Sequence, residues 1–196
     1  MEFSETLARR RMVRNYTDEP VTRDQLERIA LAGARAPSAG NTRGQSFVIV
    51  TDAPTRRAIA GLAGESHYVD MGFDPWISRA PAHIIIGASE AAYHDRYQEA
   101  DKLGPEGEID WPVPYWWVDA GASLMAILLA AIDEGLAAGF LGVHAFDELE
   151  SLVGMPDEVS AIGIVTIGHP APDRRSGSLN RSAPTGIHWD RWTART

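Results

Sequence analysis

Three short apolar runs in this chain predict buried β-strands. The segments SFVIVT (46–51), AHIIIGA (82–88) and AIGIVTIG (161–168) are rich in β-branched residues and too short for buried helices. The stretches between them are longer and show helical spacing of apolar residues. Strands separated by helices predict a layered α/β or α+β fold.

Two helices carry clear start signals. Thr22 followed by Gln25 forms a capping-box pattern, which predicts a helix over about 22–36. Pro54, just after an aspartate, predicts the first turn of a second helix over about 53–63.

The longest apolar stretch, 118–138, has enough residues to cross a bilayer. It contains Asp119, Asp133 and Glu134, and each would cost roughly 2.5–3.5 kcal/mol near the centre of a membrane. We therefore expect a helix buried within the protein or shared between two subunits.

The other segments have weaker patterns. A glycine-marked turn is expected over 139–142, followed by a short helix over about 147–153. The segment 89–117 is expected to be irregular; its many aromatic residues suit either a lid over a binding site or a subunit interface. The polar C-terminal stretch, 171–196, is expected to extend over a surface, such as that of a partner subunit.

Composition excludes several classes of partner and compartment. The 196 residues include 18 basic and 27 acidic ones, a net charge of −9, which disfavours binding to nucleic acid or to an anionic membrane. There is no cysteine, so disulfides and thiolate metal sites are excluded. The N-terminal sequence lacks the apolar core of a secretory signal, and a cytoplasmic location is expected.

Common catalytic motifs are missing from the sequence. We find no G-x-G-x-x-G after a strand, no phosphate-binding P-loop and no G-x-S-x-G nucleophile motif. The six histidines have no metal-binding spacing, so no metal site is expected, and His83 is interpreted as a strand residue. A hydrolase or metalloenzyme has no basis in these residues.

An arginine cluster near the N-terminus is the main candidate for ligand binding. Arg10, Arg11 and Arg14 have the spacing i, i+1 and i+4, which at the end of a helix can direct guanidinium groups toward one phosphate. The alternative is a solvated basic surface without a ligand.

The order of several motifs resembles the FMN-dependent nitroreductase family. These motifs are RRRMVRNYTDEPV (9–21), APSAGNTRGQSFVIV (36–50), an apolar helix followed by the glycines of 135–142, IGIVTIGHP (162–170) and a basic C-terminal tail. The resemblance implies a single FMN-binding domain over 1–196. Its fold would be α+β, with three layers, a central mostly antiparallel sheet flanked by helices, and an intertwined homodimer.

The resemblance also implies roles for residues at both ends of the chain. Arg10 and Arg11 would bind the FMN phosphate, and Arg14 would lie near the ribityl chain and the pyrimidine edge. Met12 stands in the same element, where the family commonly has a serine. Arg181 would be the C-terminal phosphate ligand, with Arg174 and Arg175 as alternatives.

Two loops complete the site that the resemblance implies. Pro37, Ser38, Ala39 and Asn41 would reach the flavin from the other subunit. The loop formed by Gly142, Val143, His144 and Ala145 would lie beside flavin N5, where a backbone N–H donates. His144 is the one side chain with a candidate catalytic role. The sequence Arg43-Gly44-Gln45 departs from the usual Gln-Pro-Trp, which leaves the outer contacts of the first loop open.

The implied activity is a two-step oxidoreductase reaction. NADH or NADPH reduces FMN at N5 and leaves, and the reducing equivalents then pass to a small flat aromatic acceptor such as a nitroaromatic or a quinone. Two alternatives stay open. One is a different flavin reaction on the same fold, such as metabolite dehydrogenation, dehalogenation or use of a deazaflavin; the other is a flavin-binding module without turnover.

Overall fold

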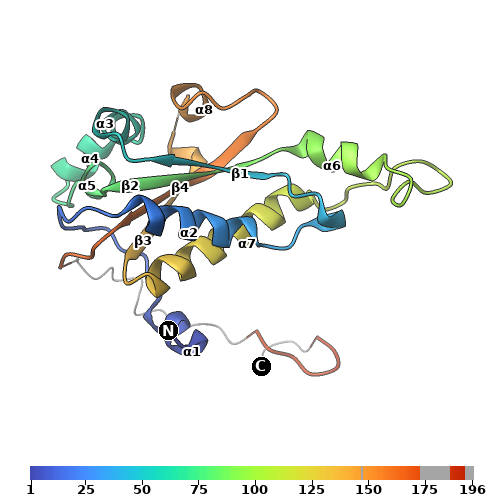
Figure 1. The fold of residues 1–196 in the computed structure, drawn as a ribbon, viewed down its shortest axis with the longest axis horizontal. Helices are drawn as coiled ribbons and strands as arrows, with labels where there is room; N and C mark the ends of the chain where they lie inside the picture. Colours follow the sequence, from blue (N-terminus) through green and yellow to red (C-terminus); the bar gives the residue numbers. More distant parts are fainter. Residues whose placement is uncertain (147, 173–185, 193–196) are drawn as a thin grey trace.

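The protein is described by a computed structural model that covers residues 1–146, 148–172 and 186–192 (Figure 1). The helices are α1 (Phe3–Arg9), α2 (Arg23–Ala34), α3 (Ala53–Leu62), α4 (Glu65–Asp70), α5 (Trp76–Arg79), α6 (Glu90–Tyr97), α7 (Tyr115–Asp133) and α8 (Leu149–Leu152). The strands are β1 (Gln45–Val50), β2 (Ala82–Ala88), β3 (Ala137–Gly142) and β4 (Ser160–Gly168). Two short 3-10 turns, η1 (Ala39–Asn41) and η2 (Val143–Ala145), lie in loops.

The strands form one antiparallel sheet in the order β1-β2-β4-β3. Strands β2 and β4 are central, and every residue of β2 is buried. Covering both faces of a strand removes the usual alternation of apolar and polar residues, which explains the continuous run AHIIIGA. Strands β1 and β3 form the two edges of the sheet.

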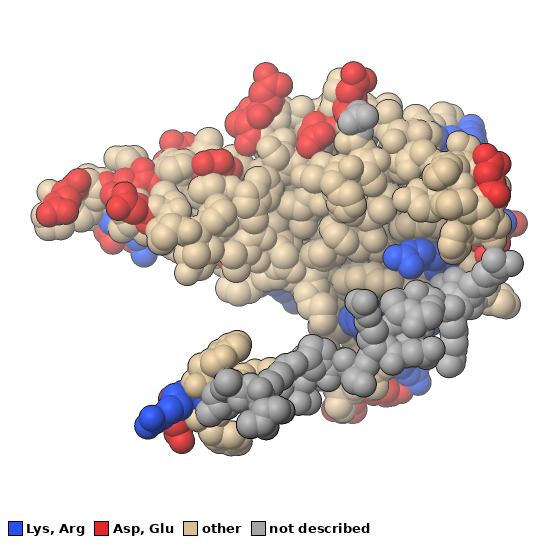
Figure 2. Space-filling view, turned by 180° about the vertical axis from the view of Figure 1, so that it is seen from behind, with Lys and Arg blue, Asp and Glu red and all other residues tan. Residues whose placement is uncertain are grey.

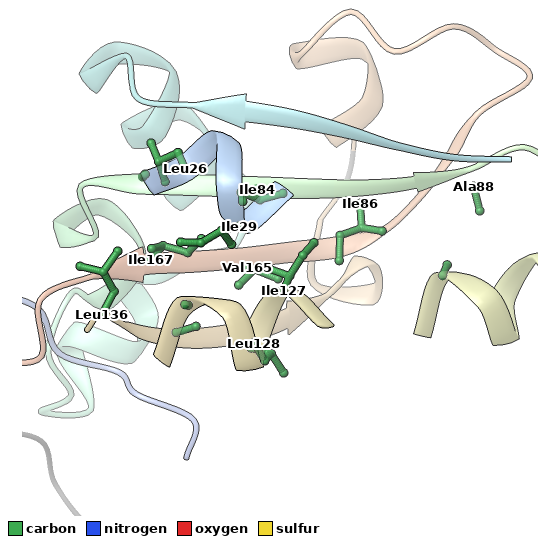
Figure 3. Close-up of a cluster of buried hydrophobic side chains, with 14 of the residues drawn as sticks. Leu26, Ile29, Ile84, Ile86, Ala88, Ile127, Leu128, Leu136, Val165 and Ile167 are labelled. Carbon is green, nitrogen blue, oxygen red and sulfur yellow. The ribbon is translucent and has the colours of Figure 1, made fainter. Parts of the chain in front are cut away.

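Helices cover both faces of this sheet (Figure 1). On one face, α2 and α7 pack together, and their apolar side chains meet Ile84 and Ile86 of β2 and Val165 of β4 (Figure 3). On the other face, α3, α5 and α8 pack around Ile85 of β2 and Ile164 of β4. The predicted three-layer α+β architecture is therefore confirmed for the single chain.

Two expectations about the middle of the chain were wrong. The predicted turn over 139–142 is the second half of strand β3, and the long helix runs over Tyr115–Asp133 instead of 118–138. The chain reverses earlier, at Gly135, which has the positive φ of 77° that favours glycine. The strand AAGFLG was missed because it has no β-branched residue.

The segment 89–117 is also more regular than expected. It contains α6, which begins where the Ser89 hydroxyl accepts a hydrogen bond from the Ala92 N–H, and it ends within the first turn of α7. The short helix expected over 147–153 is confirmed at Leu149–Leu152, whereas α4 and α5 had no counterpart in the sequence prediction.

Helix α7 is long and apolar enough to cross a membrane by length and composition alone. In the structure, 44% of its apolar window is buried against the protein. Its inner face packs on α2 and the sheet, while Trp117, Val118 and Met125 are exposed. The helix is therefore not buried on all sides within the single chain, and the alternative of a helix shared between two subunits stays a prediction.

The fully buried His83 of β2 makes fold stability depend on pH. Its Nε2–H donates to the Ile77 carbonyl at 2.8 Å, while in the described part of the chain Nδ1 has no hydrogen-bond partner. Burial, partly offset by that hydrogen bond, lowers the pKa of His83 from 6.5 to about 4, and the charge of Arg56 acts in the same direction as burial. The folded protein therefore keeps this imidazole neutral at a pH where the unfolded chain protonates it.

We expect the free energy of unfolding to fall by about 3 kcal/mol through this group as the pH decreases from 6.5 to 4. Well above pH 6.5 the imidazole is neutral in both states and contributes no pH dependence. The measurement is urea unfolding of wild type and His83→Gln across this range, because glutamine can still donate to Ile77 but does not titrate. Parallel stability curves for the two proteins would contradict the assignment.

Candidate functional site

The arginine segment, residues 10–14, lies on extended backbone. Helix α1 ends at Arg9, and Arg10 already has extended dihedral angles, φ −62° and ψ 119°. The helical spacing expected for Arg10, Arg11 and Arg14 was therefore wrong, although all three lie on one short segment. Arg11, Met12 and Arg14 are exposed, whereas Val13 between them is buried.

Hydrogen bonds hold this segment against the free edge of β3. The Val13 N–H donates to the Ala138 carbonyl at 3.0 Å. The buried Tyr16 hydroxyl lies 3.0 Å from the Val13 carbonyl oxygen and 2.7 Å from Thr166 Oγ1 of β4. A side chain at Gly139 would collide with the Val13 carbonyl oxygen, so glycine at that position allows the close approach.

The start of the C-terminal tail lies beside the same segment. The Thr17 N–H donates to the His169 carbonyl at 2.9 Å, and the Ala171 N–H donates to the Asn15 carbonyl at 3.1 Å. The Asn15 side chain donates to the Pro172 carbonyl at 2.7 Å. The chain after β4 therefore begins next to the arginines. Arg181 and its alternatives, Arg174 and Arg175, lie outside the described residues.

The guanidinium carbon of Arg14 lies 5.7 Å from the ring centroid of Trp76, in a cation–π arrangement. Trp76 is buried in the first turn of α5, where it packs in the same cluster as Val13. The indole therefore gives Arg14 a fixed surface on which to lie, so its charge stays close to the edge of β3.

The loop before β1, residues 37–43, has a conformation that few sequences adopt. Gly40, Asn41 and Arg43 all have positive φ, at 63°, 54° and 57°. Ser38 Oγ accepts a hydrogen bond from the Arg43 N–H at 2.9 Å. The Ala39 N–H donates to a carboxylate oxygen of Asp119 at 2.8 Å. This loop is held in place by side chains from outside it.

The loop after β3 forms the turn η2. Gly142 ends the strand, and His144 is exposed, with Val143 and Ala145 partly buried. A Cβ at Gly142 would lie 2.9 Å from the Nδ1 atom of His144, so the imidazole folds back over this glycine. The backbone N–H groups of this loop lie at the end of the edge strand.

The sheet register shows which parts of the predicted site meet within one chain. At one end of the sheet, Gln45 of β1 pairs with Ala88 of β2, and Ala88 pairs with Ser160 of β4. Gly142 of β3 pairs with Gly163 of β4 near the same end. The 37–43 loop therefore lies at the β1 edge and the 142–145 loop at the β3 edge. Because two strands lie between them, the edge strands β1 and β3 are about 14 Å apart.

The arginine segment shares an edge with only one of the two loops. It lies at the beginning of β3, beside Ala138, and the 142–145 loop follows the end of that strand. The structure thus brings the arginines and the 142–145 loop to one edge strand. Residues Pro37 to Asn41 of the same chain are at the far edge and at the opposite end of the sheet.

Two surface hollows in the described part of the chain lie away from these residues. One is lined by residues around α8, including Glu148, Met155 and Asp157, and the other by residues of α3 and α4. Neither includes a residue of the predicted flavin site. In one chain the arginine segment and the 142–145 loop lie instead along the edge strand β3.

The arm, defined as residues 98–114, folds back on α6 and α7. The Glu108 carboxylate forms three hydrogen bonds, with His94 Nδ1 at 2.7 Å, Trp111 Nε1 at 2.6 Å and Gln98 Nε2 at 2.9 Å. The Glu108 hydrogen bond raises the pKa of His94. Trp111 also stacks edge-on against Tyr97, with ring centroids 4.6 Å apart.

Several aromatic side chains of 89–117 therefore pack against one another within the chain, around Tyr93, Trp111 and Trp116. Tyr115 and Trp117 remain exposed at the start of α7. The two interpretations of this segment, a lid or an interface, both stay open as predictions.

The sequence prediction did not include Asp119, Tyr93 or Arg96 among the site residues. Each of them contacts or supports the 37–43 loop. Asp119 accepts a hydrogen bond from the backbone of the loop, and Arg96 donates one to it. The Tyr93 hydroxyl donates to Asp119. A carboxylate inside an apolar helix was a signal available in the sequence, because such a group needs buried donors.

Comparison with known proteins gives a consistent result. The family model described as "Nitroreductase family" matches residues 7–169. A protein of Archaeoglobus fulgidus, provisionally named as an NADH dehydrogenase/NAD(P)H nitroreductase, is 28% identical over 93% of this chain and 94% of its own. An FMN reductase [NAD(P)H] of Bacillus subtilis is 31% identical over 87% of this chain and 66% of its own.

Among solved structures, a nitroreductase family protein from Streptococcus pneumoniae has the same fold. Its TM-score is 0.75 at 19% identity, covering 97% of this chain and all of the other. The matched range 7–169 includes the arginine segment, the 37–43 loop and the 142–145 loop. The chain belongs to the nitroreductase family.

Proposed function

We propose that this protein is an NAD(P)H-dependent FMN oxidoreductase. The observation that carries the proposal is the placement of Arg10, Arg11 and Arg14 on the free edge of β3, the strand that leads into the 142–145 loop. Two relatives support it, because their names include NAD(P)H nitroreductase and FMN reductase.

The donor set fits a flavin mononucleotide. Guanidinium groups bind phosphate through paired, charge-assisted hydrogen bonds, and three of them lie within five residues here. The segment that carries them is fixed by Val13 and Tyr16, so its position does not depend on a ligand. Arg10 and Arg11 would hold the phosphate, and Arg14 would lie toward the polar edge of the ring.

When bound, FMN supplies the hydride chemistry at its N5 atom. The protein's part is to bind and orient. The backbone N–H groups of Gly142 to Ala145 would donate to the ring, and Ser38 and Asn41 of a second subunit would provide polar contacts. The positive charge of Arg14 would favour the more negative, reduced form of the ring.

The reaction would follow a two-step exchange. The nicotinamide nucleotide would bind first and leave after reduction, and a flat acceptor such as a quinone or a nitroaromatic would then occupy the same place. The exposed aromatic residues Tyr115 and Trp117 suit such an acceptor, since flat apolar molecules stack on aromatic rings.

The proposed site requires a homodimer. A single chain places the 37–43 loop and the arginine segment at opposite edges of the sheet, so a second copy would supply the missing half. The outer face of α7 exposes Trp117, Val118 and Met125, and α1 exposes Phe3 and Leu7. Figure 2 shows the molecule hollowed between its main body and residues 186–192. A second copy would bury this apolar surface.

The first test of the function is spectroscopic. We expect protein purified or reconstituted with FMN to absorb in the visible range, and to bleach anaerobically on addition of NADH or NADPH. Reoxidation by a quinone or a nitroaromatic would complete the cycle. Flavin-loaded protein that stays oxidised with both nucleotides would contradict the proposal. Reduction by another donor alone would indicate a different flavin reaction.

The second test concerns the phosphate contact. Arg10→Ala should weaken FMN binding by roughly 10- to 150-fold, the factor that corresponds to the loss of one charged hydrogen-bonding group. Isothermal titration of the flavin-free protein gives this value. Arg9→Ala is the matched control, because Arg9 pairs with Glu5 on the exposed side of α1 and is not assigned to the flavin. Equal effects of the two substitutions would count against a specific phosphate site.

The third test concerns the shared site. Light scattering should give a mass near twice 21.3 kDa. Arg10→Ala and Asn41→Ala should each bind FMN weakly, whereas refolding the two variants together should recover tight sites, because each mixed dimer contains one site with both residues intact. A monomeric flavin-loaded protein, or no recovery on mixing, would exclude the shared arrangement.

A further inference from the structure

We propose that the buried carboxylate of Asp119, together with the Tyr93 hydroxyl, positions the 37–43 loop for flavin binding. This inference rests on the proposed function. Asp119 and Tyr93 are positioning residues here, because they act on the loop and are not expected to contact the flavin themselves.

Asp119 is a carboxylate placed where a charge needs strong partners. It lies on the inner side of the second turn of α7 and is only 7% exposed. Within the ranges that the structure describes, no cation pairs with it, and one carboxylate oxygen accepts both the Ala39 N–H and the Tyr93 O–H, each at 2.8 Å. A buried charge without these donors would be strongly destabilising, so the carboxylate keeps both in place.

Tyr93 fixes the direction of this small network. Its side chain is fully buried in α6, and its hydroxyl accepts a hydrogen bond from Gln45 Nε2 at 2.7 Å. Burial and the hydrogen bond to Asp119 raise the pKa of Tyr93, so the phenol stays protonated. Its one proton therefore goes to Asp119, which links the start of β1 to α6 and α7.

The loop fits closely against α6. A Cβ at Gly40 would lie 2.8 Å from Cε2 of Tyr97, and one at Gly44 would lie 2.7 Å from Cε2 of Tyr93. Arg96 Nε donates to the Gly40 carbonyl at 2.9 Å. The residues of the loop with positive φ are thus held by two helices. Helix α6 contacts Gly40 in the middle of the loop, and Asp119 of α7 binds Ala39 near its start.

The anchor at Ala39 controls the groups proposed to meet the flavin. Ser38 and Asn41 lie one and two residues from the Ala39 N–H. Both side chains also bind Arg43, through Ser38 Oγ to its N–H and Asn41 Oδ1 to its Nε. If the Ala39 anchor is lost, these residues must become ordered when flavin binds, and the affinity should decrease.

The test uses Asp119→Asn and Tyr93→Phe in the full-length protein. In the flavin-free state we expect the Ala39 amide to exchange its hydrogen at least tenfold faster in Asp119→Asn and faster by a smaller factor in Tyr93→Phe, with the amides of β2 unchanged. In Asp119→Asn the dissociation constants of FMN and of riboflavin should both rise about tenfold. Tyr93→Phe keeps the carboxylate and its bond to Ala39, so its effects should be the smaller of the two.

Two features separate positioning from a general loss of stability. Asp119→Asn should weaken FMN and riboflavin by the same factor, whereas Arg10→Ala should weaken only FMN, because riboflavin has no phosphate. Asp133→Asn, on the same helix, and Tyr68→Phe, on α4, are matched controls. Asp133 is exposed and pairs with the N-terminal amine, and Tyr68 is an exposed residue distant in sequence from the loop. Both should leave flavin affinity unchanged.

Unchanged exchange at Ala39 in Asp119→Asn would overturn the anchoring role. Faster exchange with unchanged affinity for both flavins would overturn the link between the loop and binding. If Asp119→Asn fails to fold, Tyr93→Phe decides the same two points. Wild-type protein that binds neither flavin would overturn the proposed function and the flavin part of this inference, while the exchange rate of Ala39 would still decide the anchoring part.

Discussion

The strand order β1-β2-β4-β3 is the constraint on which the rest of the structure depends. With β2 and β4 in the centre, both faces of the sheet must be covered by helices, and β1 and β3 become its edges. Among the described residues no further strand pairs with the outer side of β3, and the Val13 N–H donates to the Ala138 carbonyl there, which holds the arginine segment. The same order puts the 37–43 loop at the other edge. The separation of the two halves of the candidate site follows from this one arrangement, and it is the reason why we propose a second subunit.

Helix α7 connects the core with the candidate site. One face is apolar and packs on α2 and the sheet, the outer face exposes Trp117, Val118 and Met125, and the first turns carry the buried Asp119. A helix with two apolar sides is typical of a subunit interface, and a carboxylate such as that of Asp119 would be costly to place in lipid. If the outer face meets a second copy, the carboxylate that anchors the loop lies on the same helix that forms the interface. Dimer formation and loop order would then be physically linked.

The sequence predicted the parts of the fold whose burial is complete. Strands β2 and β4 are covered on both faces, so their residues form continuous apolar runs that need no periodicity to be recognised. Strand β3 was missed because it has no β-branched residue and contains glycine. Gly139 must leave room for the Val13 carbonyl, a requirement set by a segment more than a hundred residues away. The arginines were identified as a group, but the prediction that they converge from the end of a helix was wrong. Helix α1 ends at Arg9, and the local sequence pattern does not show that end. Asp119 was noticed only as a charge unsuited to lipid; its partners, Ala39 and Tyr93, come from elements distant in sequence.

A protein with a net charge of −9 can still bind an anionic mononucleotide, because the acidic residues are distributed unevenly. Many of them gather on the projecting arm, at Glu99, Asp101, Glu106, Glu108 and Asp110 (Figure 2). Three of these carboxylates are paired locally, Glu99 and Asp101 with Arg96, and Glu108 with His94 and Trp111. At physiological ionic strength the field of an exposed charge decays over about 8 Å, so acids on the arm have little effect on a phosphate several strands away. The local charge at the edge of β3 is set by Arg10, Arg11 and Arg14, and it is this local charge that an anionic ligand meets.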